Sequence, residues 1–152
     1  MIEAHAIMNI PMDIYLINRG IYRGVSTFDQ LSNVFAAQPS GRTNLVAVLD
    51  KMAQDHIGTD MGKSLVVHIL TDGHPTNTVG TEDMDGFSRW LRNRNCMTKT
   101  FFSIILCTDD EEIERAYRPL EYNPGWNRGI PGVDVTEDYR GELRDVRRTR
   151  GH

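Results

Sequence analysis

Two polar residues in this sequence are of the types that hold a divalent metal ion in proteins. Asp72 follows the apolar run Leu65-Val66-Val67-His68-Ile69-Leu70-Thr71 and begins the turn Asp72-Gly73-His74-Pro75. Thr43 lies well upstream, directly after Gly41-Arg42. A carboxylate and a hydroxyl are hard oxygen donors, and Mg²⁺ takes oxygen ligands. The two residues therefore predict a cation site, provided that the fold brings them to the same place.

Each of these residues also has a structural interpretation. The pair Asp72-Gly73 is a common start for a turn, because Asp hydrogen-bonds the backbone beyond it and Gly tolerates positive φ. Thr43 is a suitable N-cap for a helix whose apolar residues recur at helical spacing, namely Leu45, Val48, Leu49 and Met52. A helix cap and a metal ligand are compatible roles if the loop lies at the edge of a sheet. The sequence leaves both interpretations open.

The run before Asp72 indicates the fold that would position these side chains. A continuous Val/Ile/Leu strand is typical of a parallel sheet buried on both faces, and such sheets bind ligands beyond the carboxyl ends of their strands. We expect further strands at Asp13–Asn18, Tyr22–Val25, Thr100–Cys107 and Val133–Val135. We expect a helix that begins at Ser26 or Thr27 and carries its apolar residues on one face, namely Phe28, Leu31, Val34 and Phe35. We expect further helices beginning near Thr43, Thr81 and Asp109, and a last one over Asp138–Arg148. This alternation predicts one α/β domain over residues 1–152, with three layers, a mostly parallel sheet and helices on both faces.

Composition and charge exclude several classes of protein. The chain is 39% hydrophobic and 25% charged, as in ordinary soluble domains. Its net charge of −4 is too mild to indicate nucleic-acid or membrane-surface binding. The N-terminus lacks the pattern of a signal peptide, and no apolar run is long enough to span a bilayer. Cys96 and Cys107 form no C-x-x-C pair, so we expect a reducing, cytoplasmic setting. We also expect Cys107 and His68 to be buried in strands.

Two segments resemble motifs of the von Willebrand factor A family. Gly41-Arg42-Thr43-Asn44-Leu45 is similar to its G-x-T-x-[LI] loop, and Thr71-Asp72-Gly73 to its strand-ending T-D-G. Asp13–Asn18 also resembles the second strand of microbial and viral-type intracellular members, and 133–142 resembles their C-terminal stretch. The family carries a metal-ion-dependent adhesion site at the edge of a Rossmann-like sheet. The resemblance implies Thr43 as a ligand and Asp72 as a direct or water-bridged ligand of Mg²⁺ or Mn²⁺.

The resemblance also implies a kind of partner. In the family, an Asp or Glu side chain of a partner protein completes the shell of the metal ion. The residues that would form the partner-binding rim here are Gly41, Arg42, Gly73, His74 and Pro75. No nucleophile or general base is arranged around Thr43 or Asp72 in the sequence, so we do not expect an enzyme.

One motif of the family is missing. No D-x-S-x-S occurs in the sequence, and in the family this motif follows the first strand, upstream of the segment matched by Asp13–Asn18. That strand is central in the family's sheet, beside the strand matched by Leu65–Thr71. We therefore expect an incomplete domain, weak or absent metal binding, and an unpaired sheet edge that is open to self-association.

Two other functions remain open at the level of the sequence. Asp72 at a strand end is also consistent with Mg²⁺-dependent phosphoryl transfer, although such sites usually have a second carboxylate and position 74 is His. Alternatively, the chain is a truncated relative that serves as a scaffold without a metal. The sequence favours the protein-interaction module over both.

Overall fold

The computed structural model describes residues 10–36, 38, 41–56, 64–93, 99–122 and 128–137. In chain order its elements are β1 (Met12–Leu16), β2 (Gly20–Val25), α2 (Phe28–Phe35), α3 (Leu45–His56), β3 (Leu65–Thr71), α4 (Met84–Arg92), β4 (Thr100–Leu106), α5 (Glu111–Tyr117), the 3-10 turn η1 (Arg118–Leu120) and β5 (Val133–Thr136). All five predicted strands are present within about two residues of the expected bounds. The helix expected over Asp138–Arg148 lies outside the described residues, as does Cys96.

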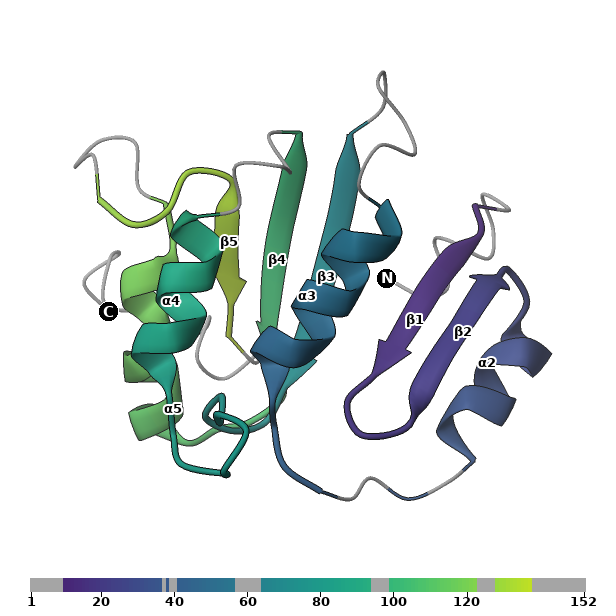
Figure 1. The fold of residues 1–152 in the computed structure, drawn as a ribbon, viewed down its shortest axis with the longest axis horizontal. Coiled ribbons are helices and arrows are strands. Elements are labelled where there is room, and N and C mark those ends of the chain that lie inside the picture. The colour runs from purple at the N-terminus through teal and green to yellow at the C-terminus, as the bar shows by residue number, and fades with distance from the viewer. Residues whose placement is uncertain are drawn as a thin grey trace, which may run out of the picture.

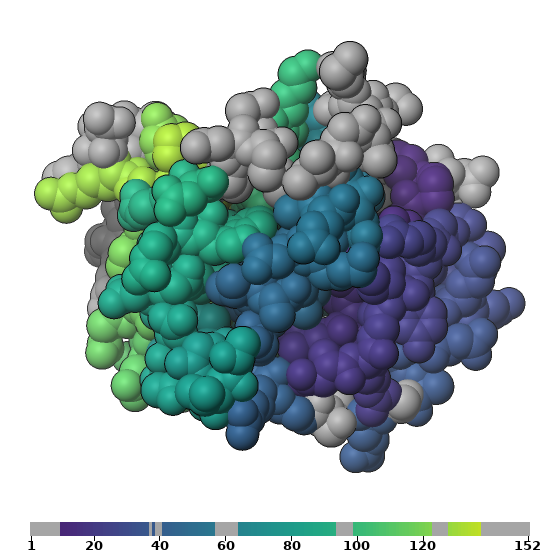
Figure 2. Space-filling view, viewed as in Figure 1, coloured from purple at the N-terminus to yellow at the C-terminus, as the bar shows by residue number. Residues whose placement is uncertain are grey.

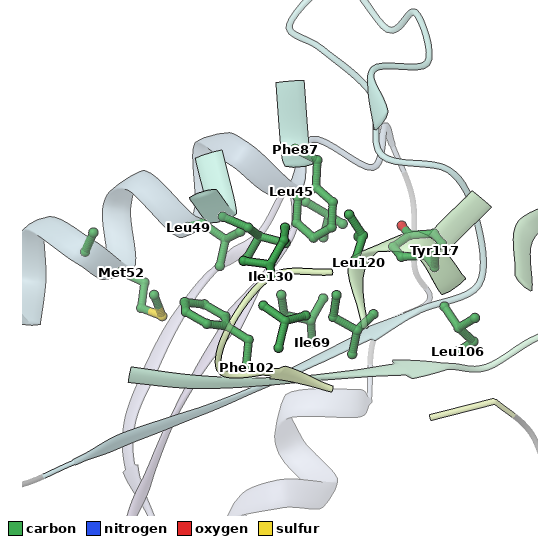
Figure 3. Packing of buried hydrophobic residues seen from close by; sticks show 14 residues of the cluster. Leu45, Leu49, Met52, Ile69, Phe87, Phe102, Leu106, Tyr117, Leu120 and Ile130 are labelled. Carbon is green, nitrogen blue, oxygen red and sulfur yellow. The ribbon is translucent and has the colours of Figure 1, made fainter. Parts of the chain in front are cut away.

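Three strands form a parallel sheet in the order β3-β4-β5. Helices α3, α4 and α5 pack on one face of it (Figure 1). The core between these layers includes Phe87 and Leu91 of α4, Phe102 and Ile104 of β4, and Tyr117 of α5, all at most 1% exposed. Figure 3 shows Phe87, Phe102 and Tyr117 of this core on the same side of the strands. A mixed α/β fold with a parallel sheet is thus confirmed.

The opposite face of this sheet is exposed where strands β3 and β4 run side by side. Val66, Leu70 and Phe101 are 56%, 51% and 54% exposed, and His68 between them is exposed as well. The expectation that β3 is buried on both faces, with His68 in the core, is therefore wrong. A continuous apolar run has the same appearance whether one face or two are covered, because coverage depends on other parts of the chain.

The remaining two strands form a separate antiparallel hairpin, β1–β2. On one face it packs against α2, where Val25, Leu31 and Val34 make a small buried cluster. On the other face Tyr15 and Ile17 pack against the main core. Within the described residues, β1 pairs with β2 and β3 pairs with β4, and no pairing joins β1 to β3.

Helix α2 begins as the sequence predicts but buries a narrower stripe than expected. Thr27 is its N-cap, and its side chain and that of Gln30 form a capping box. Leu31 and Val34 are buried, whereas Phe28 and Phe35 are 66% and 58% exposed. The expectation that these two phenylalanines face inward is wrong, because a two-stranded hairpin covers only one side of the helix.

Candidate functional site

The structure brings the Thr43 loop and the loop after Asp72 into direct contact. The backbone N–H of Thr76 donates a hydrogen bond of 2.8 Å to the carbonyl of Thr43. The guanidinium of Arg42 donates through Nη1 to the carbonyl of Thr78 at 3.2 Å. Both loops lie at the edge where β3 and β4 end, at the bottom of Figure 1. The two predicted ligands thus belong to loops that meet, at the edge where parallel sheets bind ligands.

Thr43 is not the N-cap of α3. The side-chain oxygen of Asn44 accepts a hydrogen bond of 3.1 Å from the N–H of Ala47, three residues on, which is the capping interaction. Thr43 is half-buried, and its carbonyl accepts from Leu45 as well as from Thr76. Within the described residues its hydroxyl makes no hydrogen bond. The helix-cap interpretation of Thr43 is therefore wrong, and its hydroxyl has no structural partner there.

Asp72 is presented on a turn that buried groups hold in place. The carbonyl of Gly73 accepts from the Thr71 hydroxyl at 3.1 Å and from the Tyr117 hydroxyl at 3.0 Å. Asp72 itself is exposed, and no described residue donates a hydrogen bond to its carboxylate. Two donors to one carbonyl hold the turn, so the backbone of Asp72 lies at a defined place beyond the end of β3.

Tyr117 acts as a hydrogen-bond donor at this turn throughout the neutral range. Burial raises the pKa of Tyr117 to about 12, and the negative charge of Asp72 contributes in the same direction, against an opposing hydrogen bond with Thr71. Because the phenol stays protonated, it can donate to the Gly73 carbonyl. Tyr117 is a residue of the site that the sequence did not indicate, since nothing local marks a helix-ending tyrosine as a partner of a distant turn.

The rim residues have different roles. Gly41 has φ +102°, and a Cβ there would lie 2.6 Å from Asn18 Nδ2, so this close approach requires glycine. Gly73 has open space around it, and His74 is half-buried. Pro75 is fully buried, and its carbonyl accepts from the N–H of Asp83 at 2.8 Å. Pro75 therefore shapes the loop from within and offers no surface to a partner.

Asn18 is a second residue of this edge that the sequence analysis missed. It follows β1 in the left-handed conformation, with φ 70°, and its Nδ2 donates to the carbonyl of Arg42 at 2.7 Å. The turn signal Asn18-Arg19-Gly20 was visible in the sequence, but its contact with residue 42 was not. Through Asn18 the hairpin touches the Thr43 loop.

The described donors could supply part of a cation shell. No group of three or more His, Cys, Asp or Glu in the described ranges could hold a metal ion. Thr43 and Asp72 are two oxygen donors, and Mg²⁺ prefers about six oxygens in an octahedral array. One further polar atom lies in the adjoining loop, because the Thr76 hydroxyl is buried and has no hydrogen-bond partner. A cation held here would keep several water ligands.

Cys107 lies beside this edge, at the end of β4. It is exposed, so the expectation that it is a buried hydrophobe is wrong. Its N–H donates to the carbonyl of Thr71 at 2.7 Å, which continues the β3–β4 pairing past the last strand residue.

No helix in the described part of the chain combines the length and apolarity needed to cross a bilayer.

Comparison with known proteins found no match. No family model fits the chain, no curated protein is significantly similar to it, and no solved structure resembles it significantly.

Proposed function

We propose that this chain is a protein-interaction module of the von Willebrand factor A type, with an incomplete metal-ion-dependent adhesion site. Thr43 and Asp72 are its cation ligands. The rim residues that meet the partner are Gly41, Arg42, Gly73 and His74, while the buried Pro75 shapes the loop. The observation that carries the proposal is the hydrogen bond from Thr76 N–H to the Thr43 carbonyl. It joins two segments that are far apart in the sequence and that resemble two motifs of one site.

The state of the two side chains supports this role. The Thr43 hydroxyl is not used as a helix cap, because Asn44 performs that function. The Asp72 carboxylate is exposed and receives no hydrogen bond from the described residues, while Tyr117 and Thr71 hold its turn. No described residue occupies these two oxygens, and Asp72 is exposed while Thr43 is half-buried. Both oxygens are therefore open to water or to an external ligand.

The separation of the two sheets also supports the proposal. β1 and β3 run in the same direction without pairing, and α3 lies beside both (Figure 1). The resemblance places the family's first strand at this position in the sheet, and the D-x-S-x-S loop would follow that strand. The finer fold that we propose is therefore a three-layer, Rossmann-like domain in which the described residues provide no strand at the position of the family's first strand.

The chemistry proposed is cation-bridged recognition. A bound Mg²⁺ or Mn²⁺ would offer an open position to an Asp or Glu carboxylate of a protein partner. The chain itself contributes Thr43 and Asp72, while Gly41 admits Asn18 and so sets the shape of the loop. With few protein ligands the affinity is weak. We propose no catalytic role, because no described nucleophile or general base is hydrogen-bonded to either ligand.

The test is a titration of the chain with Mn²⁺ and Mg²⁺ by isothermal calorimetry. We expect weak binding at one site, abolished by Asp72→Asn and weakened about tenfold or more by Thr43→Val, a loss typical of one removed metal ligand or its support. Asp29→Asn and Ser32→Ala, at exposed positions of α2, are controls and leave the heat unchanged. The absence of any heat with the unmutated chain would leave the metal-free scaffold as the better description. Loss of binding in the controls alone would also contradict the assignment.

A further inference from the structure

The hairpin and α2 are attached to the rest of the described molecule by side chains rather than by a shared sheet. We call residues 12–35 the arm; it comprises β1, β2 and α2. No strand pairing in the described ranges joins it to β3-β4-β5. Figure 2 shows the purple hairpin lying directly against the blue helix α3, which has α4 on its other side. Among the described residues, the arm is held by its contacts with α3, by its contact with the loop before α3, and by the packing of Tyr15 and Ile17 against the main core.

At one end of the hairpin, Arg23 joins β2 to both β1 and α3. Its Nη1 lies 2.6 Å from Asp13 Oδ2, and its Nη2 lies 2.6 Å from Asp55 Oδ2. The same Nη1 donates to the Tyr15 hydroxyl at 3.0 Å, and the guanidinium carbon lies 5.6 Å from the centre of the Tyr15 ring. One side chain thus contacts three groups on two elements, in the fork geometry that only arginine provides.

Further residues of α3 complete this network. Lys51 Nζ lies 2.7 Å from Asp55 Oδ1. The Tyr15 hydroxyl donates to Asp55 Oδ2 at 3.1 Å and lies 3.3 Å from His56 Nε2. His56 Nε2 is also 3.9 Å from Asp13 Oδ2. Lys51 and Arg23 lower the pKa of Asp55 to about 2, so this carboxylate is ionised in the folded protein at neutral pH.

At the other end of the hairpin, the arm contacts the loop that carries Thr43. Asn18 Nδ2 donates to the Arg42 carbonyl at 2.7 Å and fills the space over Gly41. Thr43 follows directly, and its carbonyl is held by Thr76. The arm therefore connects the ion network at α3 with the loop at the candidate site.

We call the contacts of Arg23 with Asp13, Tyr15 and Asp55, together with Lys51 and His56, the latch. We propose that the arm is a conformational element that the latch holds on α3, and that its docking holds the Gly41–Thr43 loop in position. Release of the latch loosens the arm while the parallel sheet stays folded. Only the effect on cation binding rests on the proposed function; the latch and the loop contact do not.

The composition of the latch makes it sensitive to salt. The Arg23 and Lys51 side chains are about half exposed, at 49% and 53%. The Debye length falls from about 10 Å at 0.1 M to about 3 Å at 1 M ionic strength, so salt screens partly exposed ion pairs. The apolar core under α4 and α5 has no such sensitivity. High salt thus weakens the docking of the arm selectively.

The test is native-state hydrogen exchange of the full chain, followed by NMR at low and high salt. In Arg23→Gln we expect amides of β1 and β2 to exchange at least about tenfold faster, as in subglobal opening, and those of β3 and β4 to change less than about twofold. The Thr76 amide, which donates to Thr43, also exchanges faster. The control Arg89→Gln, at an exposed residue of α4, changes none of these rates. In the unmutated chain, we expect 1 M NaCl to accelerate the exchange of the β1, β2 and Thr76 amides as Arg23→Gln does, and to leave the β3 and β4 amides nearly unchanged.

The opposite results are equally well defined. Equal acceleration of hairpin and sheet amides in Arg23→Gln, or no acceleration of either, would overturn the latch. If the hairpin amides exchange faster in Arg23→Gln but the exchange rate of the Thr76 amide is unchanged, the arm does not hold the Thr43 loop in position. If Arg23→Gln does not fold, hydrogen exchange of the unmutated chain is measured in increasing denaturant instead. The proposal requires the amides of β1 and β2 to open at a lower denaturant concentration than those of β3 and β4, and simultaneous opening would overturn it. None of these readouts needs a metal ion, so they fail independently of the proposed function.

Discussion

The parallel-sheet region and the arm are held together by different physical means. In the sheet region, side chains such as Phe87, Leu91 and Ile104 are completely buried between α4 and β4. In the arm, the buried cluster consists of Val25, Leu31 and Val34. The contact of the arm with the rest of the molecule combines ion pairs to α3 with the packing of the half-buried Tyr15 and Ile17. Burial of apolar surface is the dominant stabilising term in folding. Partly exposed ion pairs contribute little each and respond to salt.

This difference predicts two levels of stability within one chain. The sheet region has the composition of a folding core, and the arm has that of an element that opens first. The candidate site lies where the two regions meet, because Asp72 belongs to the sheet region and the Thr43 loop is contacted by Asn18 of the arm. Cation binding would then depend on both regions, and an agent that loosens either one would weaken it.

The largest predicted effect is in the sheet region. Phe87 is fully buried and lies edge-on to Tyr117, with ring centres 6.0 Å apart. We expect Phe87→Ala to lower the free energy of unfolding by about 3–5 kcal/mol, because it leaves a cavity in the core. Urea unfolding followed by circular dichroism measures this loss. If Phe87→Ala lowered the free energy of unfolding by less than Val34→Ala in the arm, the comparison between the two regions would be reversed.

The corresponding change in the arm should be smaller and local. Val34 is 3% exposed and packs against the hairpin. Val34→Ala removes two methyl groups, at a cost of about 1.5 kcal/mol. We expect hydrogen exchange to accelerate in β1 and β2 while β3 and β4 keep their protection. A uniform loss over both regions would show that they unfold as one unit.

Most helices and strands could be predicted from the sequence, because their signals are local. Thr27 caps α2, and the apolar spacing of Leu45, Leu49 and Met52 gives the buried face of α3. The meeting of the Thr43 and Asp72 loops at one edge also follows from the order of strands and helices. These features depend on periodicity, capping and the geometry of parallel sheets.

The features that could not be predicted depend on contacts between distant segments. The exposure of Phe28 and Val66 reflects which faces lack a neighbouring layer, and periodicity does not report that. Arg23 and Asp55 are 32 residues apart, and Tyr117 is 44 residues from Gly73. Nothing in either local sequence indicates these pairs. The choice of Asn44 over Thr43 as cap depends on where the helix begins, to one residue, which sequence patterns resolve poorly.

That choice of cap gives a third prediction, at the boundary of the two regions. Asn44→Ala should lower the free energy of unfolding by about 1 kcal/mol, because the N–H of Ala47 loses its acceptor. Thr43→Ala should change it by less than about 0.5 kcal/mol, as for a residue outside any such feature. Thermal unfolding of both variants makes the comparison. A larger loss for Thr43→Ala would restore the cap interpretation and remove an argument for its role as ligand.

The smallest effect concerns acid. The pKa of Asp55 is held at about 2, below the ordinary value of about 3.9 for Asp. The stability that this carboxylate contributes is therefore complete above about pH 4 and is lost as the pH falls toward 2. We expect hairpin amide signals to broaden or shift in this range before those of β3 and β4. In Asp55→Asn the arm should be looser at neutral pH, and an undiminished acid response of the arm there would assign the effect to other groups.

The proposal that Thr43 and Asp72 hold a cation together is tested most directly by paramagnetic line broadening. Substoichiometric Mn²⁺ is added to the ¹⁵N-labelled chain, and the broadening of each amide signal is measured by NMR. We predict selective broadening of residues 41–44 and 72–76, and its loss in Asp72→Asn. Broadening centred elsewhere, for example on the acidic start of α5 at Glu111 and Glu112, or none at all, would contradict the assignment of this site.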